Sequence, residues 1–211
     1  AGIYLQEDLN YQKTYYLTLA VRNDYSSVLS ENAPDILYPR ISGAVRVDQF
    51  DFTPDFLNFL KFRFGYGESG QLPGLRSASP LRWAGETNGY GVGVNIYSIG
   101  NNDIEPERIR EIEVGLEFEL MRRYGVDFTY YSQNANKSIV DVENPPSTGL
   151  TQSKVPKNLG KIKIWGLESA LYAKPVQTKN FSLNLNMIIN YQNDEILETG
   201  MEQPYILGFG N

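Results

Sequence analysis

Neither cysteine nor histidine occurs among the 211 residues of this chain. Without histidine there is no Ser-His or Cys-His nucleophile pair and no imidazole general base. Without cysteine there is no disulfide framework, iron–sulfur cluster or thiolate zinc site. The sequence therefore restricts metal binding to all-oxygen sites of the calcium or magnesium type.

A cationic surplus and long apolar runs are missing as well. Lys and Arg number 19 against 25 Asp and Glu, a net charge of −6, which argues against nucleic acid as a partner because nucleic acid favours a basic footprint. No apolar run approaches the roughly 18–20 residues of a membrane helix. The mean hydropathy is −0.37, which is also ordinary for a transmembrane β-barrel, because barrel strands are apolar on one face only.

The dominant pattern in the sequence is alternation with a period of two residues. In the second strand segment Leu17, Leu19 and Val21 alternate with polar or small residues, as in a strand with one apolar and one polar face. The same alternation occurs in the segments 41–48, 61–67, 111–120, 126–131, 166–173 and 181–191, and more weakly in 3–9, where Glu7 interrupts the apolar side. The sequence thus predicts an all-β fold of about eight antiparallel strands, many near the 9–11 residues that span a bilayer.

The links between these segments alternate in length. Tight turns are expected at 12–13, 121–123 and 174–180, and long links at 25–39, 68–107 and 135–163, with a moderate one at 51–58. The segment 54–60 has the best helical pattern, but it is short and is interpreted as a turn. Sorting of short turns and long loops onto opposite edges is typical of an up-and-down outer-membrane barrel, and we expect function to lie in the long loops.

A soluble β-sandwich would show the same alternation. Sandwich strands cluster near 5–6 residues, whereas these are longer, and aromatic residues mark several strand ends here, as interface girdles do: Tyr11, Tyr15, Tyr124, Phe181 and Tyr191. One set of side chains separates the two folds, because it faces lipid in a barrel and forms the core in a sandwich: Leu17, Leu19, Val21, Val114, Leu116, Phe118, Leu183, Leu185 and Met187.

Charged residues gather on the polar side of two predicted strands. Glu111, Glu113, Glu117 and Glu119 form a column with neighbours roughly 6–7 Å apart, and Lys61 and Arg63 are expected near Glu117 and Glu119 if the two strands pair. We interpret these six residues as a cross-strand charge ladder on the wall of a wet lumen. A glycosidase-like carboxylate pair is the alternative, but nothing in the sequence marks one carboxylate as different.

The long links supply the candidates for substrate contact: Trp83, Tyr90, Tyr97, Asn101, Asp103 and Trp165. Aromatic faces suit sugar rings and apolar ligand parts, although the same rings can simply pack the loops down. The stretch 101–105 has oxygen ligands for a loop calcium but lacks EF-hand spacing, which favours an ordinary polar loop and no cofactor. The glycine-rich stretch 89–93 is followed by neither lysine nor helix and is interpreted as loop or strand rather than a phosphate site.

Several stretches resemble the barrel of SusC/RagA-type TonB-dependent transporters. They are 4–11, 15–18, 22–27, 60–63 with 65–67, 102–108 leading into 113–117, and the most specific group, 146–149, 158–162 and 166–168. Alone, the Asn-Asp-Ile-Glu-Pro-Glu-Arg stretch at 102–108 fits siderophore-type TonB-dependent receptors equally well. The combination favours the SusC-like branch, and the resemblance extends over nearly the whole chain.

This resemblance implies an integral outer-membrane barrel of about 22 strands with a plugged lumen, which imports oligosaccharides or peptides without catalysis. It also implies a SusD-like surface lipoprotein as a cap and TonB as the energy source. Residues 1–211 would then be part of one barrel domain, about a third of it, without signal peptide, plug or TonB-contacting segment. Because open strand edges cannot face lipid unpaired, we expect the working protein to be longer. A siderophore receptor and a soluble carbohydrate-binding β-sandwich are the alternatives.

Overall fold

The computed structural model describes residues 1–29, 36–75, 77–78, 81–144, 146–149 and 154–200. Strands account for nearly all of its regular structure. They are β1 (Gly2–Tyr11), β2 (Tyr15–Asp24), β3 (Ile36–Arg46), β4 (Leu57–Gln71), β5 (Leu81–Asn88), β6 (Gly91–Ile99), β7 (Glu107–Leu120), β8 (Tyr124–Glu143), β9 (Lys154–Gln177) and β10 (Ser182–Glu198). Two short 3₁₀ turns, η1 (Val47–Gln49) and η2 (Pro146–Thr148), lie in the links. Within these described ranges no helix is long and apolar enough to cross a membrane.

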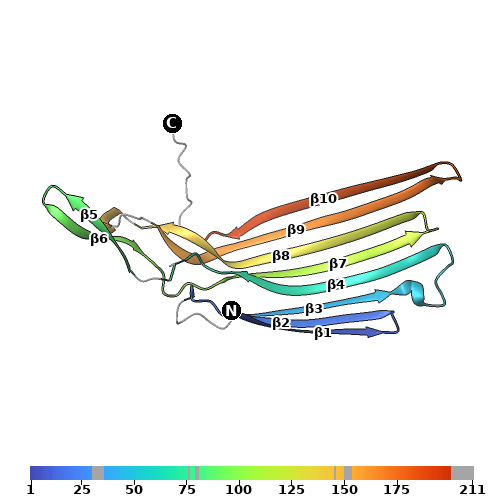
Figure 1. Ribbon diagram of the computed structural model, residues 1–211, viewed down its shortest axis with the longest axis horizontal. Helices are drawn as coiled ribbons and strands as arrows, with labels where there is room; N and C mark the ends of the chain where they lie inside the picture. The colour runs from blue at the N-terminus through green and yellow to red at the C-terminus, as the bar shows by residue number, and fades with distance from the viewer. Residues whose placement is uncertain (30–35, 76, 79–80, 145, 150–153, 201–211) are drawn as a thin grey trace.

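Eight strands form one antiparallel sheet in the order β1-β2-β3-β4-β7-β8-β9-β10. Each strand pairs with its neighbour in sequence, except that the separate hairpin β5–β6 is inserted between β4 and β7. Figure 1 shows the eight strands side by side as a curved, twisted wall, with the β5–β6 hairpin projecting beyond one end. The prediction of an up-and-down, all-β segment of about eight strands is confirmed.

The two ends of the sheet differ in their connections. At one end, called the short-turn end, β1–β2 and β7–β8 close through the three-residue links 12–14 and 121–123. The first two residues of each link, Gln12 and Lys13 or Met121 and Arg122, have φ between 51° and 55°. Two successive residues with positive φ give the hairpin turn whose twist matches that of the strands. The other end, called the long-loop end, carries the links 25–35, 72–106 and 144–153 (Figure 1). The predicted sorting of the links by edge is thus present.

Each strand separates its side chains onto an apolar face and a polar face of the sheet. On the apolar face Leu19, Val114, Leu185 and Met187 are 43–52% exposed, and no second sheet covers them in the described part of the chain, since β5–β6 lies off the end. Open exposure of large apolar side chains is what a lipid-facing surface requires. The test set out above therefore excludes the β-sandwich.

Several strands extend farther than the sequence suggested. The link predicted at 135–163 is strand for most of its length, because β8 continues to Glu143 and β9 begins at Lys154. The predicted long loop 68–107 contains the β5–β6 hairpin, and the segment 54–60, expected as a turn, enters β4 at Leu57. The regular apolar alternation is absent from these extensions, in which polar residues interrupt it and both Ser138 and Val155 are buried.

A small core exists at the long-loop end. The buried apolar side chains among the described residues are Ile36, Tyr38, Ile104 and Val155, and Ile104 is fully buried. They come from the starts of β3 and β9 and from the segment that leads into β7. The same end carries Glu68 on the apolar face, where Arg110 Nε lies 3.1 Å and Arg108 Nη1 3.4 Å from its carboxylate. This ionic cluster shows where the apolar face ends.

Candidate functional site: the polar face and the long-loop end

The predicted charge ladder lies on one face, in the register that pairing of β4 with β7 dictates. Lys61 is directly opposite Glu117, as expected. Arg63 is opposite Gly115 and not a carboxylate, so its guanidinium extends across the glycine to bind Asp127 on β8. Arg63 was expected to lie near the glutamates of β7. It instead binds Asp127, one strand farther on, because Gly115 has no side chain in between.

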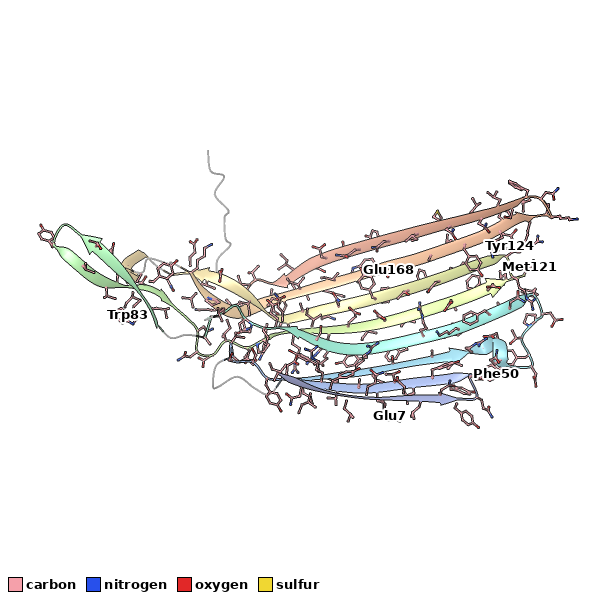
Figure 2. All side chains as sticks on the ribbon, in the orientation of Figure 1. Glu7, Phe50, Trp83, Met121, Tyr124 and Glu168 are labelled. Atoms are coloured by element: carbon pink, nitrogen blue, oxygen red, sulfur yellow. The ribbon has the colours of Figure 1, made fainter. Side chains whose placement is uncertain are left out.

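Two of the four glutamates of the ladder accept hydrogen bonds from neighbouring strands. Glu111 accepts a hydrogen bond from the side-chain amide of Gln133 on β8, and Glu119 accepts one from the hydroxyl of Tyr172 on β9. Figure 2 shows Glu168 near the middle of β9, where it is paired with Thr129 of β8. The hydroxyl of Thr129 accepts a further hydrogen bond from the guanidinium of Arg63 at 3.0 Å. Polar contacts thus run across β4, β7, β8 and β9 and form a hydrated wall.

An open groove of about 480 Å³ lies on the polar face, over the middle of β2, β3, β4, β7 and β8. Two glycines of β4, Gly65 and Gly67, line it, and Arg40 of β3 is opposite Gly67. Glu111 and Glu113 of β7 pair with the other edge of the same two glycines. The groove therefore has a cationic side and an acidic side. The glutamates were predictable from the sequence. Arg40 and the two glycines were not, because only the register between β3 and β4 brings Arg40 next to Gly67.

The aromatic candidates occupy two places, the β5–β6 hairpin and strand β9. Trp83 is on β5, 61% exposed, and Figure 2 shows it on the projecting hairpin, away from the main sheet. Tyr90 is at the tip of this hairpin and fully exposed, and Tyr97 is on β6. Trp165 is not in or beside a loop but within β9, where its ring packs against Tyr191 of β10 with centroids 5.5 Å apart. Because Trp165 shares the apolar face with Leu167 and Leu171, its position is that of a girdle residue.

Asn101 and Asp103 are held in a turn. The side-chain oxygen of Asn101 accepts a hydrogen bond from the backbone N–H of Asp103 at 3.0 Å, and its amide donates to the carbonyl of Pro156 at 3.1 Å. The stretch therefore packs against the start of β9. Among the described residues no cluster of three acidic side chains could hold a metal ion.

Asn158, which was not among the residues predicted from the sequence, joins Glu105 and Lys137 at the long-loop end. Its side-chain oxygen accepts a hydrogen bond from the N–H of Glu105 at 2.8 Å, and its amide donates to the carbonyls of Glu105 at 2.7 Å and Lys137 at 2.9 Å. Lys137, which has φ of 58° at an irregularity of β8, also forms an ion pair with Glu105. The stretches that carry the family resemblance, 102–108 and 158–162, thus contact each other. Their composition alone could not show this pairing.

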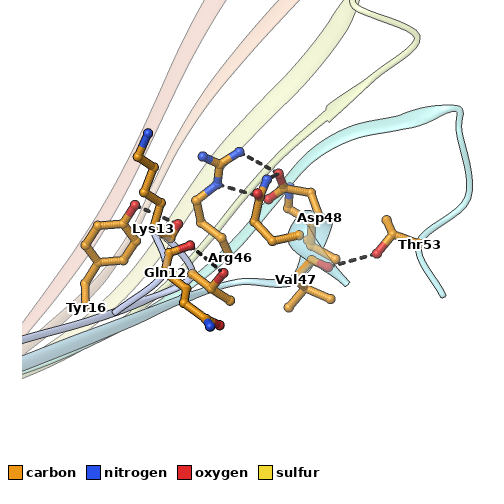
Figure 3. A network of polar contacts seen from close by, with 10 residues as sticks. Gln12, Lys13, Tyr16, Arg46, Val47, Asp48 and Thr53 are labelled. Carbon is orange, nitrogen blue, oxygen red and sulfur yellow. Dashed lines mark hydrogen bonds and ion pairs between the residues drawn. The ribbon is translucent and has the colours of Figure 1, made fainter. Parts of the chain in front are cut away.

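A second polar cluster secures the short-turn end (Figure 3). Asp48 of η1 binds Arg46 at 2.5 Å and accepts hydrogen bonds from the side chain of Gln49 and from the backbone N–H of Leu60. Burial opposes ionisation of Asp48, but these bonds outweigh it and hold its carboxyl pKa below the usual value. An aromatic row, in which Tyr15 contacts Phe50, accompanies this cluster.

Comparison with known proteins identifies the family of this wall. The profile of the family described as TonB dependent receptor-like, beta-barrel, matches residues 1–206. Curated relatives are TonB-dependent receptors with 24–28% identity; one of them, SusC of Bacteroides thetaiotaomicron, is 26% identical over 96% of this chain and 22% of its own length. The chain spans about a fifth of the length of these relatives.

Solved structures share the fold. The RagAB peptide importer in its closed-closed state matches with a TM-score of 0.88 and 21% identity, over 98% of this chain and 23% of the matched one. The siderophore receptor PirA from Pseudomonas aeruginosa matches with a TM-score of 0.64 and 17% identity, over 93% of this chain and 34% of the matched one. The strand arrangement is therefore common to both branches and fits the RagAB importer more fully.

Proposed function

Because this chain belongs to the TonB-dependent receptor-like β-barrel family, we propose that it forms wall and outer loops of a SusC/RagA-type transporter that imports oligosaccharides or peptides. Like the barrels of this family, it is an integral outer-membrane β-barrel segment. The proposed activity is capture of a ligand followed by energised uptake, without catalysis. SusC and the RagAB peptide importer, which this chain resembles, support import of a glycan or a peptide.

One observation carries this proposal, the two-faced wall with its long loops gathered at a single end. Large apolar side chains are exposed on one face, whereas the polar face carries contacts between strands, such as Arg63 with Asp127 and Tyr172 with Glu119. A barrel wall needs the first surface for lipid and the second for a wet lumen. The long-loop end then faces outside the cell, where ligand arrives.

Roles for the candidate residues follow from these positions. Trp83, Tyr90 and Tyr97 belong to the hairpin that extends past the sheet, so they would meet ligand or partner first. The partner proposed there is a SusD-like surface lipoprotein, which would cap the long-loop end. TonB would act through another part of the receptor. No observation favours a siderophore over a glycan or peptide as ligand.

A gene deletion tests the proposed function. Cells that lack the complete receptor gene are supplied with single oligosaccharides or with defined oligopeptides as the sole carbon or nitrogen source. We expect loss of growth on one of these classes, restoration by the intact gene, and the same loss when TonB or the neighbouring lipoprotein is removed. Unchanged growth on every glycan and peptide, together with a defect in iron uptake, would replace this function by siderophore transport.

A further inference from the structure

The apolar face of the sheet changes in character toward the long-loop end. One cross-strand row near its middle is apolar and aromatic: Phe64, Val114, Tyr130, Leu167 and Tyr191. Two rows farther toward the long-loop end the residues are charged or carry an amide: Glu68, Arg110, Asn134, Lys163 and Glu195. The row after that contains Gly70, Arg108, Asn136, Lys161 and Glu198. Strands β7 and β9 therefore carry two cations each, on either side of two asparagines of β8.

These two charged rows lie at the height where lipid headgroups begin. Strand β8 starts at Tyr124 beside the short turn, and Asn134 follows after about 33 Å of strand. A barrel strand tilted by about 40° gains about 25 Å of height over that length, which equals the height of the lipid-facing apolar band. The row just below contains Trp165, and tryptophan side chains are enriched at the membrane interface. The charged rows thus face outward at the edge of the hydrocarbon region.

Cations on the apolar face are confined to these rows. Within the described strands of the sheet, this face carries no Lys or Arg between the charged rows and the short turns. The chain as a whole has a net charge of −6, so the grouping does not follow from an excess of cations. We call this group on β7 and β9 the cationic rim: Arg108, Arg110, Lys161 and Lys163.

The two arginines of the cationic rim share one buried acid. The side chain of Glu68 is 7% exposed, and its carboxylate lies 3.1 Å from Nε of Arg110 and 3.4 Å from Nη1 of Arg108. A guanidinium has five N–H donors, so one carboxylate leaves donors and positive charge on both arginines. The arginine side chains are 38% and 51% exposed, which makes these donors accessible to a second anion.

The two lysines also retain charge for a ligand. Nζ of Lys161 lies 2.6 Å from the carboxylate of Glu198 on β10, in an exposed pair of the kind that contributes little in water. Lys163 is opposite Glu195 in the ladder, but it forms no ion pair among the residues that the structure describes. Strand β8 contributes only uncharged amides to these two rows. The centre of this surface is therefore cationic, and its acids lie at the margins.

We propose that the cationic rim binds a phosphate-bearing lipid of the outer leaflet. The proposal goes beyond import of cargo, and it rests on the orientation proposed above, in which the long-loop end faces outside the cell. Strands β7 and β9 are two strand spacings apart, about 10 Å, so a phosphate above β8 lies about 5 Å from each of them. Arginine and lysine side chains from both strands reach this position and bind phosphate through charge-assisted hydrogen bonds.

The apolar rows next to the cationic rim favour a lipid over a soluble anion. Val114 and Tyr130, toward the middle of the sheet, are 49% and 38% exposed on the same face. The acyl chains of a lipid whose phosphate is at the rim extend along this surface and cover it. Such a ligand gains both ion pairing and apolar burial, whereas inorganic phosphate gains only ion pairing, which salt screens.

The test measures lipid binding by the complete receptor, purified in a neutral detergent. The probes are lipid A with two phosphates, the same lipid A without phosphate, and inorganic phosphate alone. Lys161→Gln combined with Lys163→Gln removes two cations of the rim. Lys174→Gln combined with Lys179→Gln is the matched control, because it removes the same charge from exposed positions at the short-turn end. Heat-modifiable gel mobility confirms that each variant is folded.

The arginines are tested together with the acid that they share. Arg108→Gln and Arg110→Gln alone would leave the buried carboxylate of Glu68 without its partners and destabilise the fold. The arginine variant therefore combines both changes with Glu68→Gln, which removes the guanidinium groups and leaves no buried charge behind.

We expect the lysine variant and the arginine variant each to raise the Kd for phosphorylated lipid A by about tenfold, because each removes charge-assisted hydrogen bonds to phosphate. Lipid A without phosphate should bind wild type more weakly and bind all variants equally, and the control should resemble wild type. Equal binding of the two lipids by wild type, or an unchanged Kd in both rim variants, overturns the proposal.

Two further outcomes identify a different occupant. If inorganic phosphate binds wild type as tightly as phosphorylated lipid A does, the rim is a site for a soluble anion and the lipid site is wrong. If the rim variants no longer co-purify with the neighbouring lipoprotein but bind lipid A as wild type does, the rim is a protein interface and the lipid site is again wrong.

Growth of cells on glycans or peptides measures the transport function separately. A receptor that binds phosphorylated lipid A as expected but restores growth on neither class of cargo retains the lipid site and loses the proposed transport function. A receptor that restores growth and binds both forms of lipid A equally retains the transport function and loses the lipid site.

Discussion

The two ends of the sheet hold their strands together in different ways. At the short-turn end, short links and polar contacts suffice, among them the Asp48–Arg46 ion pair and the hydrogen bond from Arg122 N–H to the side chain of Asn58 at 2.7 Å. At the long-loop end, Asn158 binds the backbone of Glu105 beside a buried apolar residue, Ile104. The difference shows that short links can be held by polar contacts alone, whereas the end made of long loops also has a small core.

The middle of the sheet connects the two ends, and a change there should have the largest effect. Leu116 is on the apolar face between Phe62 and Phe128. Leu116→Arg places a charge toward lipid and should cost about 2–4 kcal/mol of folding free energy near the bilayer midplane. Glu117→Gln, next to it on the polar face, is the matched control. Folding of the complete receptor into lipid vesicles measures both, and equal losses would contradict the assignment of the faces.

A change at Asn158 should loosen the long-loop end alone. Asn158→Ala removes three hydrogen bonds and leaves backbone groups of Glu105 without their partner, which should cost about 1–3 kcal/mol. Limited proteolysis should then cut within 72–106 faster than in wild type, while the turns at 12–13 and 121–122 stay protected. If cleavage increased equally at both ends, the two ends would not be independent.

The smallest effect is expected at the short-turn end, from Asp48. The pKa of its carboxyl is lower in the folded protein than its usual value of 3.8, so its ionised form stabilises the fold above that pH. This stability is lost as pH falls below 3.8 and through the lower folded pKa. Asp48→Asn should cost about 1 kcal/mol at neutral pH and remove this acid sensitivity. Unfolding curves at pH 7 and pH 3 measure it, and an unchanged pH response in the variant would contradict the role of Asp48.

Much of the fold could be predicted from the alternation in the sequence. The segments around Leu17, Val114 and Leu185 were recognisable because one face had to be apolar, and that requirement leaves a period of two. The outer parts of β8 and β9 and the β5–β6 hairpin were not recognisable, because polar residues interrupt the alternation there. Trp165 was placed beside a link because the predicted strand began at residue 166, whereas β9 begins at Lys154.

The candidate site was predictable only in part. Glu111, Glu113 and Lys61 followed from the polar parity, and the pairing of Lys61 with Glu117 followed from the expected hairpin. The contact of Arg63 with Asp127 depends on two other strands, because β7 has no side chain at Gly115 and β8 carries Asp127. The space over Gly65 and Gly67 likewise depends on what the neighbouring strands place beside each glycine.

By itself, the sequence determined the strand class, the two faces and the edge on which the long loops gather, because these depend on the order of apolar and polar residues along one strand. Only the tertiary structure decided which residues meet across strands. Register between β3, β4 and β7 brings Arg40, Gly67 and Glu111 into one row. Whether a glycine is covered or open depends on the side chains that neighbouring strands place beside it. The register decides this, because a shift of one residue would turn every side chain of a strand to the other face.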